Sequence, residues 1–257
     1  MSEFNDKESA NENTNAVADV ELNEEYVQMN GFQKAIGIIT SPKKTLLSLS
    51  VKPSYVIPII LIIIVPILHF FLAWSGYEKM MIESLEMGLA GTGVEVTPEL
   101  INMQLNVSKW AMVLVAVFGG LGGAAFSALY YFVAAKIAKS DVSYGRLFSV
   151  QLHVAIIGLL SYIILTILVV LGNPAVAYTS LAMVLPQSMQ TTFIGGLLSP
   201  IEFFGIWSLI VMYYGMRIVA KVSKKAALIS VIVALLASML FTGATLGLTT
   251  AMTGMMG

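Results

Sequence analysis

Cysteine is absent from the 257 residues, and charged residues make up only 11% of them. The absence of cysteine excludes disulfides, thiolate metal sites and cysteine nucleophiles. A soluble domain carries roughly 25% charged residues, whereas this chain is 57% hydrophobic and has a mean hydropathy of +0.84. The composition therefore predicts an integral membrane protein built from transmembrane helices.

Catalytic signatures are missing as well. The sequence contains no HExxH, GxSxG, Walker A or glycine-rich dinucleotide motif. Ionisable side chains within the apolar runs are also too few for the relays that proton-driven transporters use. We therefore expect no enzyme activity and no cofactor or metal, and we expect the partners to be the lipid bilayer and a membrane protein, not a nucleic acid.

The first 30 residues are polar, and eight of the fifteen acidic residues lie within the first 25 positions. This segment lacks the basic start and apolar core of a signal peptide. We expect residues 1–30 to form a disordered, acidic cytoplasmic tail. A solubilising role is the interpretation that we favour over a role as an interaction segment.

Residues 32–49 are too short and too polar to span a membrane, but their pattern is that of helices at the interface. The apolar side chains of the first half recur at helical spacing: Phe32, Ala35, Ile36 and Ile39. Ser41 and Pro42 predict the N-cap and first position of a second short helix. Three lysines would then face anionic head groups: Lys43, Lys44 and Lys52.

Apolar runs beyond this segment predict a transmembrane domain over residues 31–250 and an all-α bundle of five helices. The expected spans are residues 55–74, 111–135, 148–171, 201–219 and 226–248. Pro58 and Pro66 predict a kinked first span that packs within the bundle. The charge-free residues 174–198 are expected to lie on or dip into the outer leaflet, and a sixth span is the competing interpretation.

The connections between the spans predict the topology. Basic residues dominate every second connection, and the strongest case is the basic hinge between the last two spans: Arg217, Lys221, Lys224 and Lys225. Residues 77–108 are acidic instead. Because basic connections stay in the cytoplasm, we expect a multi-pass membrane protein with a cytoplasmic N-terminus and an extracytoplasmic tail over residues 251–257.

Ionisable residues inside a span are functional candidates because their burial in lipid is costly. The candidates here are His69, His153 and Glu202. Depth separates His153 from Glu202, but a polar site formed by His69 and Glu202 is geometrically feasible. The simpler alternative, which we favour, is that both side chains reach the outer interface independently.

Glycines crowd the second span at Gly119, Gly120, Gly122 and Gly123, and Gly243 and Gly247 repeat the pattern in the fifth. Small residues let helix backbones approach closely in lipid. We expect these glycines to serve packing within the chain in preference to homodimerisation.

Several short motifs resemble those of one family of membrane proteins. They are Ser41-Pro42-x-x-Thr45, Pro53-Ser54-Tyr55, Ile206-Trp207, Gly215-Met216-Arg217 and Ser223-Lys224-Lys225-Ala226. Together they resemble the bacterial branch of the Yip (Ypt/Rab-interacting protein) family over residues 32–250. The resemblance implies five helices, a cytoplasmic N-terminus and, for the bacterial branch, a location in the inner membrane. Eukaryotic members bind Rab GTPases, but this chain lacks their Asp-Leu-Tyr-Gly-Pro type motif, so the resemblance does not imply GTPase binding here. Some bacterial members are thought to accompany ABC-type exporters.

These observations predict a non-enzymatic accessory or scaffold component of another membrane complex, such as an exporter. The alternative is a small transporter or channel with a polar site near His69 and Glu202. A third interpretation, membrane shaping, rests on the amphipathic segment alone.

Overall fold

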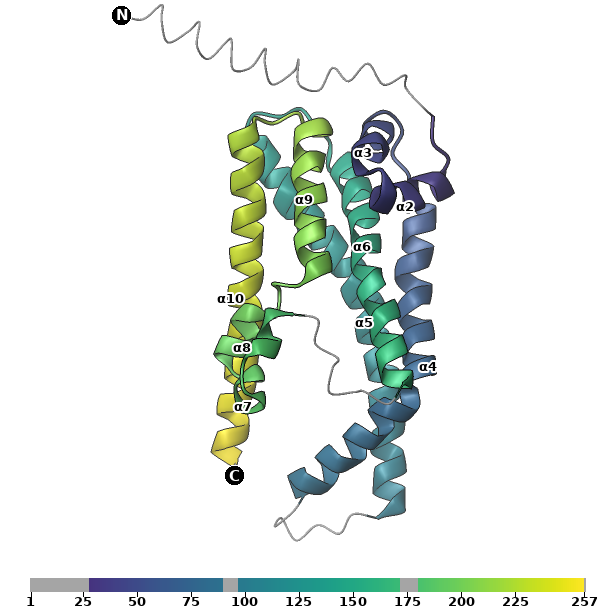
Figure 1. The fold of residues 1–257 in the computed structure, drawn as a ribbon, viewed down its shortest axis with the longest axis vertical. Coiled ribbons are helices and arrows are strands. Elements are labelled where there is room, and N and C mark those ends of the chain that lie inside the picture. Colours follow the sequence, from purple (N-terminus) through teal and green to yellow (C-terminus); the bar gives the residue numbers. More distant parts are fainter. Residues whose placement is uncertain (1–27, 90–96, 172–179, 257) are drawn as a thin grey trace, which may run out of the picture.

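A computed structural model describes residues 28–89, 97–171 and 180–256, and these residues are almost entirely helical (Figure 1). The helices, in chain order, are α2 (Gly31–Thr40), α3 (Pro42–Val51), α4 (Val56–Leu89), α5 (Pro98–Ile137), α6 (Tyr144–Val170), η2 (Leu181–Val184), α7 (Gln187–Gln190), α8 (Phe193–Leu198), α9 (Phe203–Ile218) and α10 (Lys224–Met256). The predicted all-α membrane fold is therefore confirmed.

Four helices of the described residues are long and apolar enough to cross a membrane: α4, α5, α6 and α10. The fourth predicted span, α9, has 16 residues, so it is about 24 Å long and shorter than a hydrocarbon core of about 30 Å. The count of five spans is thus approximate, because α9 alone does not reach across.

The first two spans extend well beyond their predicted ends. Residues 75–89 continue α4, and α5 begins at Pro98 with Thr97 as N-cap, whose hydroxyl accepts from Leu100 N at 3.3 Å. At 40 residues, α5 is about 60 Å long, twice the hydrocarbon thickness. Hydropathy locates only the lipid-embedded part of such helices, because their polar ends continue the same backbone hydrogen bonding into water.

The two N-terminal helices fold back on each other and pack onto α4, α6 and α9 (Figure 1). Asn30 and Gln33 form a capping box at the start of α2, and Pro42 opens α3, although the Ser41 side chain makes no cap hydrogen bond. The predicted apolar stripe has two environments: Ala35 is buried, whereas Phe32 and Ile36 are exposed. The segment is part of the protein core because a neighbouring bundle, and not lipid alone, covers its inner face.

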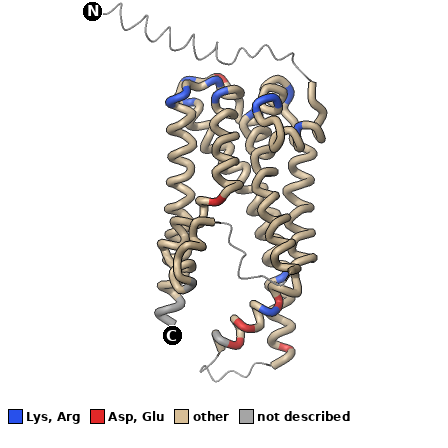
Figure 2. The backbone as a smooth tube through the Cα atoms, in the orientation of Figure 1, with Lys and Arg blue, Asp and Glu red and all other residues tan. Residues whose placement is uncertain are grey.

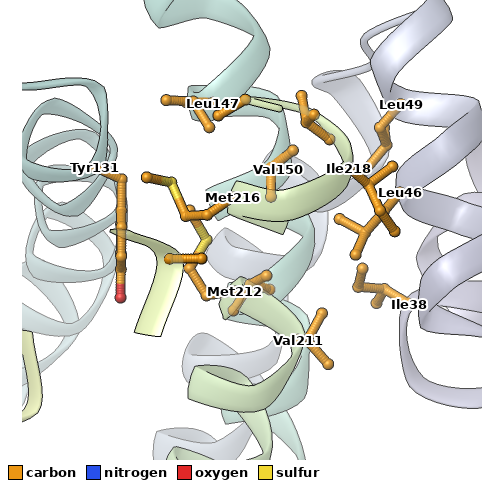
Figure 3. Close-up of a cluster of buried hydrophobic side chains, with 14 of the residues drawn as sticks. Ile38, Leu46, Leu49, Tyr131, Leu147, Val150, Val211, Met212, Met216 and Ile218 are labelled. Atoms are coloured by element: carbon orange, nitrogen blue, oxygen red, sulfur yellow. The ribbon is translucent and has the colours of Figure 1, made fainter. Parts of the chain in front are cut away.

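The main hydrophobic core lies where these two helices meet the bundle (Figure 3). Leu46 and Leu49 of α3 are fully buried and lie beside Ile218 of α9, while Val150 of α6 and Met216 of α9 lie nearer the middle of the cluster. Tyr131 of α5 closes the opposite side of the cluster. Because the cluster contains residues of six helices, α2, α3, α5, α6, α9 and α10, it fixes the relative positions of most of the bundle.

Residues 180–202 form short helices and no sixth span in the described part of that connection. Gly196 of α8 lies so close to α10 that an added Cβ would be 2.5 Å from Thr242 O. Thr242 Oγ1 in turn donates to Gly196 O at 2.7 Å. The α8 helix therefore packs beside α10. It lies beyond the end of α9 that is farther from the N-terminal helices (Figure 1).

Charge divides the bundle into two ends (Figure 2). The end that carries α2, α3 and the connections α5–α6 and α9–α10 holds most of the Lys and Arg residues, and we call it the basic end. The other end carries Glu78, Glu83, Glu86 and Glu99 on α4 and α5. The basic connections that the sequence predicts to share one side of the membrane therefore do lie together.

Candidate functional site

The most connected polar group of the described residues lies at the basic end, where α4 begins. Ser149 Oγ of α6 accepts from Ser54 N at 2.9 Å and donates to Ser54 O at 2.7 Å. His153, fully buried, has Nδ1 2.7 Å from Ser149 O and Nε2 3.3 Å from Ser54 Oγ. A carbonyl oxygen can only accept, so Nδ1 carries the proton and Nε2 accepts from Ser54.

This network explains one of the motifs on which the resemblance rests. Ser54 provides three of its hydrogen-bonding groups, and the neighbouring Tyr55 donates from its hydroxyl to Gly145 O at 3.1 Å. The motif Pro53-Ser54-Tyr55 therefore ties the entry of α4 to the first turns of α6. Sequence reasoning named His153 as a candidate but missed Ser149, because a serine in an apolar helix carries no local signal of a partner 95 positions away.

Lys34 of α2 lies beside this network and is buried, with only 2% of its surface exposed. Its ammonium donates to the backbone oxygen of Lys52, at the end of α3. Burial lowers the pKa of Lys34, and the positive charge of Lys52 lowers it further. The contact ties α2 to the end of α3, so this lysine contributes to the structure and does not project toward head groups.

His69 of α4 lies in a second polar cluster, between α4 and α6. Its Nδ1 is 2.7 Å from Thr166 Oγ1 and its Nε2 is 2.9 Å from Tyr77 OH. Thr166 uses its only proton on Tyr162 O at 2.6 Å, so Nδ1 donates to Thr166 and Nε2 accepts from Tyr77. Both nitrogens of this buried ring are therefore satisfied by side chains of the same two helices.

The structure does not bring His69 and Glu202 together. The ring nitrogens of His69 face Thr166 and Tyr77, while Glu202 occupies the N-cap position of α9 and forms a backbone bridge with Ser180. The pair that equal depth made feasible is thus not formed, because depth places residues in the same layer without fixing which helices are neighbours. The alternative, that the His69 side chain reaches the outer interface, is also wrong, since this side chain is only 2% exposed.

The four residues of the predicted basic hinge divide into two groups. Arg217 is buried, and its Nη1 donates to Val222 O at 3.0 Å, which closes the turn between α9 and α10. Lys221, Lys224 and Lys225 are exposed, and Lys221 has a positive φ of 53°. Arg217 is therefore a structural part of the turn, whereas the three lysines form its charged surface.

Replacing Arg217 by glutamine is expected to lower the free energy of unfolding by about 1.5 kcal/mol, because the shorter side chain leaves Val222 O without its charged donor. Reversible unfolding in mixed detergent micelles measures this loss. Lys225→Gln removes the same charge from an exposed position and is the control. Equal stability of the two variants would show that the turn does not depend on Arg217.

The glycines of the second span have two different environments. An added Cβ on Gly120 would lie 3.1 Å from Ile62 Cγ2, so this glycine packs against α4. Gly119, Gly122 and Gly123 have nothing within 4 Å of that position among the described residues. Packing within the chain therefore accounts for Gly120 and not for the other three.

The glycines of α10 do serve packing within the chain, as predicted. Added Cβ atoms would lie 3.1 Å from Leu197 Cδ2 at Gly243 and 3.2 Å from Phe193 Cβ at Gly247. Both contacts are made with α8. Within the described residues there is no group of three His, Asp or Glu side chains that could hold a metal ion.

Comparison with known proteins agrees with this arrangement. The family model described as the Yip1 domain matches residues 36–246. A similar protein is the membrane protein YknW of Bacillus subtilis (strain 168), which is 25% identical over 201 residues, or 77% of this chain and 83% of that protein. No solved structure gives a significant match. The matched region contains the core at the basic end, the Ser54 network and the turn closed by Arg217, and the chain is an integral membrane protein that belongs to the Yip1-domain family.

Proposed function

We propose that this protein is a non-enzymatic accessory or scaffold subunit of another membrane complex, such as an exporter. In this proposal the protein lies in a bacterial inner membrane with its basic end and N-terminus in the cytoplasm. The observation that carries the proposal is the open glycine face of α5, which consists of Gly119, Gly122 and Gly123.

Large apolar side chains flank this glycine face. Val115, Phe118 and Phe126 lie on the same side of α5 at helical spacing and are 71%, 69% and 74% exposed. The glycines thus form the floor of a notch between bulky residues. Such a notch lets a second helix approach closely, and close contact is what drives helix association in lipid.

The cost of these glycines also supports the proposal. Each glycine inside a helix is about 1 kcal/mol less favourable than alanine, and this chain places four of them within the five positions 119–123. Gly120, Gly243 and Gly247 lie against neighbouring helices of the same chain, but among the described residues nothing lies against the three glycines of the open glycine face. A helix of another protein supplies the missing contact.

The test is a tagged purification in mild detergent at native expression, with mass spectrometry of the proteins that co-purify. Wild-type protein should retain a stoichiometric membrane partner. Gly122→Leu fills the notch and should reduce recovery of the partner at least tenfold. The thermal stability of the isolated chain should not change, since no described residue lies within 4 Å of the added Cβ.

Gly158→Leu is the matched control, because an added Cβ at Gly158 on α6 also meets nothing within 4 Å in the described residues. This variant should retain the partner. Recovery of a second copy of this chain in place of another protein would contradict the proposal, as would full retention of the partner by Gly122→Leu. Isolation of the protein alone would favour the transporter alternative, for which liposome flux with Glu202→Gln is the next assay.

A further inference from the structure

A groove of 340 Å³ opens at the basic end between the start of α3 and one side of α9. From α3 it is lined by Lys43 and Lys44, and from α9 by Trp207, Ile210 and Tyr214. We propose that this groove binds an anionic phospholipid, with its phosphate against the two lysines and an acyl chain along α9.

Packing in the hydrophobic core explains why Lys43 and Lys44 lie beside this side of α9. Leu46 and Leu49, one turn further along α3, are fully buried, and an added Cβ on Gly215 of α9 would lie 3.7 Å from Leu46 Cδ2. This packing fixes the first turn of α3 beside the end of α9. As a result Lys43 Nζ lies 4.6 Å from the ring centroid of Tyr214, a cation–π distance.

The apolar wall of the groove runs along the axis of α9. Trp207, Ile210 and Tyr214 recur at helical spacing on one side of α9, and two turns separate the first from the last, or about 10 Å. Trp207 lies 12 positions from Val219, so it reaches about 18 Å into the bundle from the end of α9. An occupant must therefore be charged at the basic end and apolar at acyl-chain depth.

The positive charge of the two lysines favours an anion in the part of the groove that α3 lines. Neither Lys43 nor Lys44 makes an ion pair within the described residues, and the first turn of α3 has no acidic residue. Both lysines sit at the positive end of the helix dipole, where a cation is unfavourable and a phosphate is favourable. A lysine near an anionic membrane surface favours binding about fivefold.

An anionic phospholipid has both required parts, and the bilayer supplies it at high concentration. A peptide would have to place an apolar segment beside α9 in the hydrocarbon with its backbone polar groups satisfied. The acidic residues 1–27 of this chain carry the right charge but lie outside the described residues, and they are an alternative that the experiment distinguishes.

The experiment uses the fluorescence of Trp207 in the full chain with Trp74→Phe and Trp110→Phe, which leaves it as the only tryptophan. The protein is reconstituted in phosphatidylcholine vesicles that contain increasing fractions of brominated phosphatidylglycerol or brominated phosphatidylcholine. We expect half-maximal quenching of Trp207 at a roughly tenfold lower fraction of the anionic lipid. Lys43→Gln with Lys44→Gln should abolish this preference.

Lys221→Gln with Lys225→Gln removes the same charge at the same end but outside the groove, and this variant should keep the preference. Equal quenching by the two lipids would overturn the proposal. An equal loss of preference in both double variants would overturn it too, because it would show a bulk surface effect. A preference that emerges only after deletion of residues 1–27 would show that the acidic tail, and not lipid, occupies the groove.

Discussion

Replacing Gly196 by valine is expected to lower the free energy of unfolding by about 3 kcal/mol or more. An added Cβ would lie 2.5 Å from Thr242 O and 2.6 Å from Gly243 Cα. Both are backbone atoms of α10, so no side-chain rotation relieves the clash and the two helices must separate. Overpacking of this kind typically costs 1–3 kcal/mol, and the separation also weakens the hydrogen bond from Thr242 Oγ1 to Gly196 O.

Reversible unfolding in mixed detergent micelles measures the loss, and Gly122→Val is the control. The Cβ of that variant meets nothing within 4 Å in the described residues, so the isolated chain should change by less than about 0.5 kcal/mol. The pair separates the effect of helix approach from the general effect of replacing glycine in a helix. Similar losses in the two variants would show that α8 does not depend on its contact with α10.

Replacing Ser149 by alanine is expected to destabilise the protein by about 2.5 kcal/mol. The hydroxyl of Ser149 pairs both the N–H and the C=O of Ser54, and the variant leaves both backbone groups without this partner in a partly buried site. Each unpaired buried group costs about 1–3 kcal/mol. His153 should also lose order, because its Nε2 contacts Ser54 Oγ.

Ser48→Ala is the matched control for this prediction. Ser48 is also buried, but its hydroxyl has no hydrogen-bond partner among the described residues. Its removal should be neutral or slightly stabilising, because an unsatisfied polar group disappears. The same unfolding assay, with histidine NMR of His153 as a second readout, distinguishes the two serines. Equal stability of the two variants would show that the Ser54 network does not hold α4 against α6.

The two structural predictions concern opposite ends of the bundle. The Ser54 network lies next to the main core at the basic end, where α2, α3, α6 and α9 meet. Gly196 lies where α8 meets the far half of α10. A loss that is larger at Gly196 than at Ser149 would show that the contact between α8 and α10 contributes more to stability than the Ser54 network does.

The family motifs were visible in the sequence, but only the packing of the helices shows the structural role of their residues. Thr45 of the first motif lies against Gly37 of α2, where an added Cβ would be 2.4 Å from its Oγ1. Gly215 lies against Val150 and Leu46, and Arg217 closes the turn before α10. These motif residues therefore hold the helices of the basic end together.

The order of the apolar runs and the all-α class followed from the sequence by itself, because lipid forces each long apolar run to pair its backbone within one helix. The sequence also predicted that the basic connections lie at one end of the bundle. Successive connections between spanning helices lie at opposite ends, so every second connection shares the same end. Tertiary structure alone decided the partners: His69 with Thr166 and Tyr77, Ser149 with Ser54, and Gly196 with Thr242. Hydropathy and charge fix the depth of a residue in the membrane, but which helix faces it is set by the close fit of side chains across the bundle.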